Sequence, residues 1–131
     1  MDLNTAKNLY ITRSRQIINA NESMAKDSYG FMEMITKSKL KRHKEKLGDF
    51  YAWLRECDEA YSKNISVSGS INDLLMKQAK LGIAEKARGV FISSLNSYEK
   101  ELSNIEGNIN FKLTTSMAVL AIVVSAVMSV I

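Results

Sequence analysis

The sequence predicts an all-α protein: a long antiparallel helical hairpin, a short N-terminal helix and an apolar C-terminal helix. Three observations lead to this prediction. The 131 residues contain no proline and only six glycines, and these are the residue types that most often interrupt helices. Apolar residues recur every three or four positions through most of the chain. The last nineteen residues, 113–131, carry no charged side chain.

The first helix is expected from about Leu3 to Ile18, with Asp2 at its N-cap. An apolar stripe marks one face of this segment, formed by Leu3, Ala6, Tyr10 and Ile17. The asparagines that follow at 19 and 21 offer a break, because their side chains compete for backbone hydrogen bonds. The sequence also leaves open that the helix continues through them.

The second helix is expected over about 22–62, and its first part should bury Met24, Phe31 and Ile35. From residue 40 onward the apolar spacing alternates between three and four, which is the heptad pattern of helices that pack together. This seam consists of Leu40, His43, Leu47, Phe50, Leu54, Cys57 and Tyr61.

Residues 63–70 are small and polar and are expected to connect this helix to the next, with Ser70 and Asp73 resembling a capping box. The third helix should run from Ile71 to about Glu106, where Gly107 and Asn108 provide a stop or a flexible joint. Its apolar face has a period near 3.6 and comprises Ala84, Ala87, Phe91, Leu95, Tyr98, Leu102, Ile105 and Ile109.

A short loop between two long helices makes them antiparallel. The sequence therefore divides into a soluble hairpin domain at 1–110 and a C-terminal helix at 111–131. Two helices bury little surface for their length, so we expect the hairpin to gain stability from other copies of itself or from other subunits.

Residues 113–131 would form a helix about 28 Å long, close to the hydrocarbon thickness of a bilayer. We interpret this segment as a membrane anchor that crosses the bilayer once. A helix buried in a large protein assembly is the alternative. Small residues recur at every fourth position, which would let helices approach closely: Ala121, Ser125 and Ser129.

The chain has a net charge of +4, and residues 37–46 alone carry six basic residues and one acid. This basic patch consists of Lys37, Lys39, Lys41, Arg42, Lys44 and Lys46. A solvated helix face is the first interpretation, anionic lipid or an acidic partner the second, and nucleic acid the least favoured. In the predicted hairpin the patch lies nearer the middle of the second helix than its loop, so it need not reach the membrane.

No catalytic or nucleotide-binding motif is present, and the single histidine, His43, has no cluster of ligands at metal spacing around it. Cys57 is a lone cysteine without an obvious basic neighbour, so a low thiol pKa is not expected. The sequence therefore predicts neither an enzyme nor a cofactor.

The segment Asn72-Asp73-Leu74-Leu75-Met76-Lys77-Gln78 follows a linker containing serine and glycine and precedes a long helix. Over about residues 67–112 the chain resembles inner-rod subunits of bacterial type III secretion systems. The resemblance implies a helical subunit of a membrane-spanning export channel. The chain departs from that family in its helical N-terminal half and its almost wholly apolar last helix.

These observations together predict a non-enzymatic structural subunit of a membrane-embedded, oligomeric assembly, with a protein-secretion apparatus as one candidate. Its expected partners are the lipid bilayer and other protein subunits or copies of itself. The alternative is a small membrane-active protein that forms pores, similar to a holin.

Overall fold

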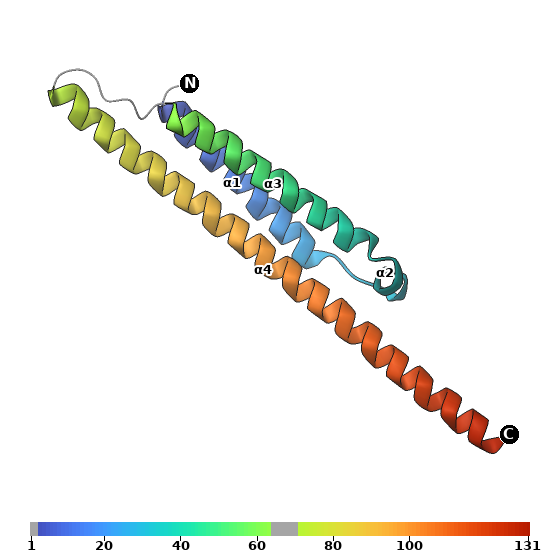
Figure 1. The fold of residues 1–131 in the computed structure, drawn as a ribbon. Coiled ribbons are helices and arrows are strands. Elements are labelled where there is room, and N and C mark those ends of the chain that lie inside the picture. Colours follow the sequence, from blue (N-terminus) through green and yellow to red (C-terminus); the bar gives the residue numbers. More distant parts are fainter. Residues whose placement is uncertain (1–2, 64–70) are drawn as a thin grey trace.

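The computed structural model describes residues 3–63 and 71–131, and this part of the chain forms four helices. They are α1 (Leu3–Lys26), α2 (Phe31–Thr36), α3 (Ser38–Ser62) and α4 (Ile71–Val130). Three long helices lie side by side, and α4 extends far beyond the other two (Figure 1). The predicted all-α class with a long helical hairpin is confirmed.

The hairpin is formed by α3 and α4, which run antiparallel (Figure 1). Contacts between the two helices give their register, because the residue numbers of the partners fall along α3 as they rise along α4. From one end to the other these pairs are Asp58–Arg88, Tyr51–Glu99, Lys44–Glu106 and Lys37–Asn110.

The first helix runs parallel to α4 and is its main neighbour along the bundle (Figure 1). The rings of Tyr10 and Phe91 meet edge to face, with centroids 6.2 Å apart. Nearer the start of both helices, Leu3 and Ile83 line the same surface hollow, so both helices advance in the same direction. The result is a three-helix bundle in which α4 is shared by α1 and α3.

The core lies along the apolar stripe of α4. The predicted α4 residues Phe91, Leu95, Tyr98 and Leu102 are all buried, and so are Leu40 and Phe50 of α3. Leu47, Leu54 and Tyr61 are partly buried and pack against this core. The hydroxyl of Tyr98 donates a hydrogen bond of 3.0 Å to the backbone carbonyl of His43, so the polar end of this buried ring is satisfied.

The break between the first two long helices lies elsewhere than predicted. Helix α1 continues through Asn19 to Lys26, and the second helix does not span 22–62. The chain leaves helical geometry at 27–30, a segment rich in turn-forming residues, and again at Lys37, whose φ of 54° is left-handed. Asn19 is exposed, so its amide does not disturb the buried stripe that holds the helix together.

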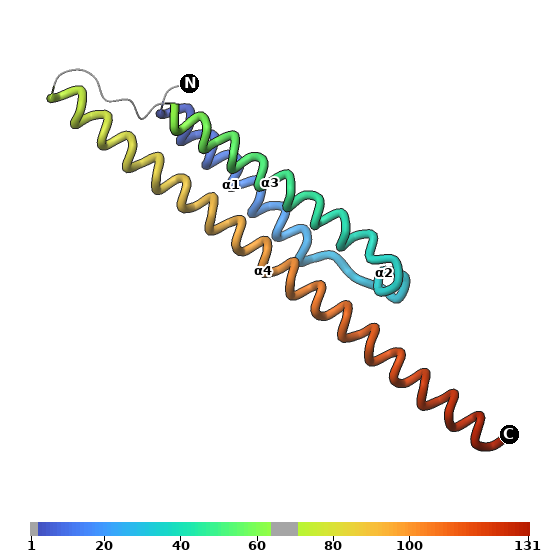
Figure 2. Tube along the Cα trace, in the orientation of Figure 1, coloured from blue at the N-terminus to red at the C-terminus, as the bar shows by residue number. Residues whose placement is uncertain are grey.

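The predicted stop at Gly107 is also wrong, because α4 is one helix of 60 residues (Figure 2). Gly107 and Asn108 both lie on the exposed face, between buried Ile105 and Ile109. A glycine within a helix costs about 1 kcal/mol relative to alanine, which packing of the flanking isoleucines offsets. The boundary predicted at residues 110 and 111 therefore falls inside a continuous helix. The connection predicted at 63–70 and the cap at Ser70 lie outside the described residues, apart from Lys63.

A polar triad ties the three long helices together near the start of the bundle. Asp58 of α3 accepts hydrogen bonds from the guanidinium of Arg88 at 2.8 and 3.0 Å and from the Tyr10 hydroxyl of α1. Burial opposes ionisation of Asp58, but the bonds from Arg88 and Tyr10 together lower the pKa of its carboxyl below the usual 3.8. The ionised form is therefore the one that the folded state stabilises.

We expect Asp58→Asn to lower the free energy of unfolding by about 1 kcal/mol at pH 7, since the triad is partly exposed. The carboxyl pKa is lower in the folded state, so this stabilisation is present above the unfolded pKa. It is lost as the pH falls through the folded pKa. Denaturant unfolding in a nonionic detergent at several pH values measures both effects. The exposed Asp49→Asn is the matched control, and a deficit for Asp58→Asn that persists undiminished at low pH would contradict the assignment.

Candidate membrane-contact end of the bundle

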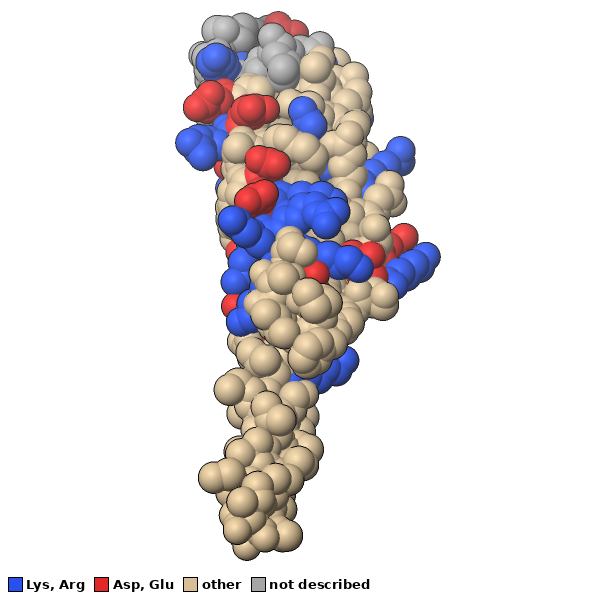
Figure 3. All heavy atoms as spheres, turned by 90° about the vertical axis from the view of Figure 1, so that its right-hand side faces the viewer, with Lys and Arg blue, Asp and Glu red and all other residues tan. Residues whose placement is uncertain are grey.

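The last part of α4 has no protein neighbours within the described structure. Beyond residue 110 only Leu113 is partly buried, and Phe111 and every residue from 114 onward are exposed. Among the described residues, α4 is the one helix with an 18-residue window apolar enough to cross a membrane. The mean hydropathy of this window is 2.1, and none of it is buried. Helix α4 therefore leaves the bundle as an uncharged apolar rod (Figure 3).

The predicted small-residue ridge lies on this rod. Ala121, Ser125 and Ser129 are all exposed and share one face, because they are four residues apart. The hydroxyl of Ser129 donates a hydrogen bond of 2.8 Å to the carbonyl of Ala126, so its polarity is satisfied within the helix. A helix with such internal bonds can lie in lipid or against another helix.

The short helix α2 lies at the same end of the bundle (Figure 1), and most of its apolar side chains are exposed. Phe31, Met32 and Ile35 are 62%, 67% and 56% exposed, whereas Met34 and Glu33 are buried. The predicted burial of Phe31 and Ile35 is therefore wrong. With only six residues, α2 has a narrow buried side, on which Met34 joins the core and Glu33 contacts the start of α3.

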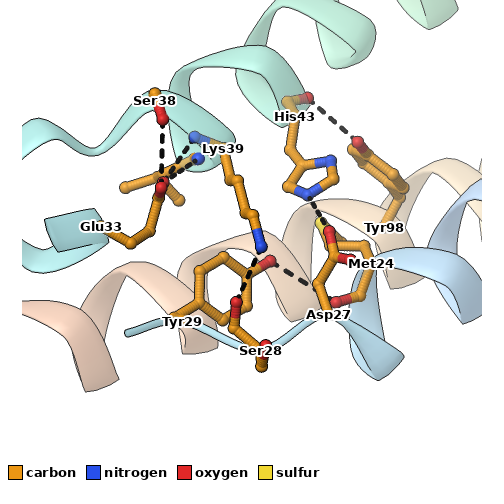
Figure 4. Close-up of polar contacts among 10 residues, drawn as sticks. Met24, Asp27, Ser28, Tyr29, Glu33, Ser38, Lys39, His43 and Tyr98 are labelled. Carbon is orange, nitrogen blue, oxygen red and sulfur yellow. Dashed lines mark hydrogen bonds and ion pairs between the residues drawn. The ribbon is translucent and has the colours of Figure 1, made fainter. Parts of the chain in front are cut away.

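Glu33 joins α2 to α3 (Figure 4). One carboxylate oxygen accepts hydrogen bonds from the backbone N–H groups of Lys39 and Leu40, and the other accepts from the Ser38 hydroxyl at 3.1 Å. Lys37 caps α3 in left-handed geometry but provides no side-chain cap. Glu33 thus satisfies two of the N-terminal amide groups of α3 from outside that helix.

The connection at 27–30 is held by further polar contacts with α3 (Figure 4). The Lys39 ammonium donates to the carbonyl of Ser28 at 3.0 Å, and His43 Nε2 lies 3.2 Å from a carboxylate oxygen of Asp27. Burial lowers the pKa of His43, with the hydrogen bond to Asp27 opposing that effect. The ring is therefore neutral at physiological pH and serves as a packed structural group.

The basic patch occupies the beginning of α3, not the middle of a longer helix as predicted. This places it near the point where α4 leaves the bundle, and Figure 3 displays Lys and Arg side chains above the uncharged rod. Lys37 donates to the amide oxygen of Asn110 at 2.9 Å, and Lys44 pairs with Glu106 at 2.8 Å. Lys39 is half-buried by its bond to Ser28, and the remaining members, Lys41, Arg42 and Lys46, are exposed.

Sequence reasoning missed α2 and Glu33 as features of this end. A visible signal existed, because Phe31-Met-Glu-Met-Ile35 is a short apolar run directly before a basic run, a composition typical of helices at a membrane surface. Glu33 offered no comparable signal, since its partners belong to a different helix.

We expect Glu33→Ala to lower the free energy of unfolding by about 1 to 2 kcal/mol, because two amide groups at the start of α3 lose their acceptor. Hydrogen exchange should accelerate at the amides of Lys39 and Leu40 before it changes in the centre of the bundle. Glu45→Ala, at an exposed site on α3, is the control. Unchanged exchange at both amides would show that Glu33 does not hold this corner.

Among the described residues, no group of three or more His, Cys, Asp and Glu side chains could hold a metal ion. Burial raises the pKa of Cys57 to about 11, so this thiol is protonated and unreactive at neutral pH. Comparison of the chain with protein-family models, curated proteins and solved structures finds no match.

Proposed function

We propose that this chain is a non-enzymatic structural subunit of a membrane-embedded, oligomeric assembly. The last part of α4 crosses the bilayer once, and the three-helix bundle stays on one side. The observation that carries this proposal is the uncharged, fully exposed window of α4 that begins where the bundle ends.

The energetics of that window favour lipid as its surroundings. Large contiguous apolar surfaces are rare on monomeric soluble proteins and mark contacts with membranes or other proteins. The projecting segment, residues 113–131, is about 28 Å long, which matches the hydrocarbon core of a bilayer. Lys112 lies at its entrance, where the ammonium group can reach lipid headgroups while the stem contacts apolar chains.

A charge in the middle of this window tests the anchor. We expect Val124→Arg to reduce the fraction of protein that floats with liposomes, because arginine at a bilayer centre costs about 2.5 to 3.5 kcal/mol. Ile71→Arg, at an exposed site 53 positions earlier on the same helix, is the control and should float like the unmodified chain. If the unmodified chain remains monomeric in solution without detergent or lipid, the anchor proposal fails.

Exposed apolar residues at the opposite end of the molecule support an assembly. Ile71, Leu75 and Met76 are more than half exposed at the start of α4, far from the proposed bilayer. Lipid cannot cover them in this arrangement, so neighbouring protein subunits are the fitting partners. The resemblance of residues 67–112 to inner-rod subunits makes a protein-secretion apparatus the assembly that we favour.

The small-residue ridge provides a test of association within the membrane. We expect Ser125→Leu to lower the mass of the native complex in mild detergent, because a larger side chain keeps neighbouring helices apart. Leu120→Ile, which conserves volume at an exposed position on the opposite side of the helix from the ridge, should leave the mass unchanged. A monomeric unmodified chain would contradict the proposal, and dye leakage from vesicles would favour the pore-forming alternative.

A further inference from the structure

We propose that α2 and the lysines around it form a second membrane-contact site, which seats the bundle on a bilayer containing anionic lipid. Helix α2 lies in the headgroup region with its exposed apolar side chains directed into the acyl boundary, and the lysines bind lipid phosphate groups. The inference rests on the proposed function, since α4 must bring this end of the bundle to the membrane.

The first argument is the height of α2 along α4. The bond between Lys37 and Asn110 fixes the end of α2 three residues before Leu113, which is about 5 Å along the helix axis. Leu113 begins the uncharged segment, so α2 is level with the expected surface of the hydrocarbon core. Phe31, Met32 and Ile35 therefore extend this apolar surface sideways from α4, and Phe111 is exposed at the same level.

The second argument is the distribution of charge. Lys37, Lys39 and Lys41 lie within about 6 Å of one another along the helix axis at the start of α3. Lys112 lies at a similar height on α4, two residues after the Asn110 that contacts Lys37. Six basic residues at 37–46 face four acidic groups near this end: Glu106 pairs with Lys44, Glu33 accepts from the α3 amides, Asp27 contacts the neutral His43 ring, and Glu45 is exposed. The lysines consequently leave a positive rim around an apolar centre, the arrangement of a helix that lies in an anionic membrane surface.

The third argument is that α2 is fixed in place before it meets lipid. Met34 is part of the buried core, and Glu33 holds α2 against the start of α3. The apolar side chains are therefore already directed outward, and little ordering is needed on binding. A second copy of the chain could also cover α2, but a positive rim on each copy would repel, whereas anionic lipid attracts it.

Depth-dependent fluorescence quenching tests the apolar contact. The full chain carries Phe31→Trp in a Trp53→Phe background and is reconstituted into phosphatidylcholine vesicles brominated near the top of the acyl chains. With phosphatidylglycerol present, we expect strong quenching and blue-shifted emission. Ile35→Trp serves as a second reporter, and Ile71→Trp is the control that should remain unquenched.

The outcomes separate this inference from the proposed function. Failure of the chain to float with vesicles would overturn both. Flotation with water-like emission at both reporters would overturn the α2 site alone. Blue-shifted emission without quenching by brominated lipid would also overturn it, and would assign α2 to a protein interface.

Matched charge variants test the anionic rim. We expect the combined Lys37→Gln, Lys41→Gln and Lys112→Gln changes to lower the equilibrium constant for binding of α2 to the membrane surface by about fivefold per lysine. The dependence of quenching on phosphatidylglycerol should then disappear. The control changes Lys63, Lys80 and Lys86 to Gln at the other end of the bundle, so both variants lose three charges. If the chain with all of its lysines unchanged is quenched equally with and without phosphatidylglycerol, the claim that these lysines bind anionic lipid is refuted.

Discussion

The packing of α1 and α3 against one apolar stripe of α4 is the constraint on which the rest of the structure depends. The stripe runs from Ala84 to Ile109, and both other long helices use it as their common core. Helix α4 does not end where the stripe ends. The part of α4 inside the bundle and the uncharged segment are therefore one continuous helix. The direction in which the apolar rod leaves the bundle is therefore set by core packing and not by a flexible linker.

The corner at Glu33 determines what surrounds the exit of α4. By capping α3 from α2, it allows the chain to reverse within a few residues, so α3 begins beside the end of the α4 stripe. The same reversal brings the basic run to this end and leaves α2 with its apolar side outward. A single buried carboxylate thus places both apolar and positive side chains next to the segment proposed to enter the membrane.

The heptad spacing of α3 and the 3.6-residue period of α4 were sufficient to predict the hairpin, because each helix has one face that must be buried. Breaks were harder to place. Asparagines at 19 and 21 and Gly107 are local signals against helix, but buried neighbours on the same helices outweigh their small cost. Phe31 and Ile35 were predicted to be buried because they are apolar, yet burial depends on which side of α2 has a partner.

The sequence by itself determined the helical class, the pairing of two long helices and the uncharged segment, since these follow from periodicity and composition along one chain. Tertiary structure decided that α1 lies parallel to α4, that Asp58 joins three helices, and that the basic patch lies at the exit of the apolar rod. These features depend on where the chain reverses direction. The reversal is set by contacts between residues on different helices, and local propensity does not encode those contacts.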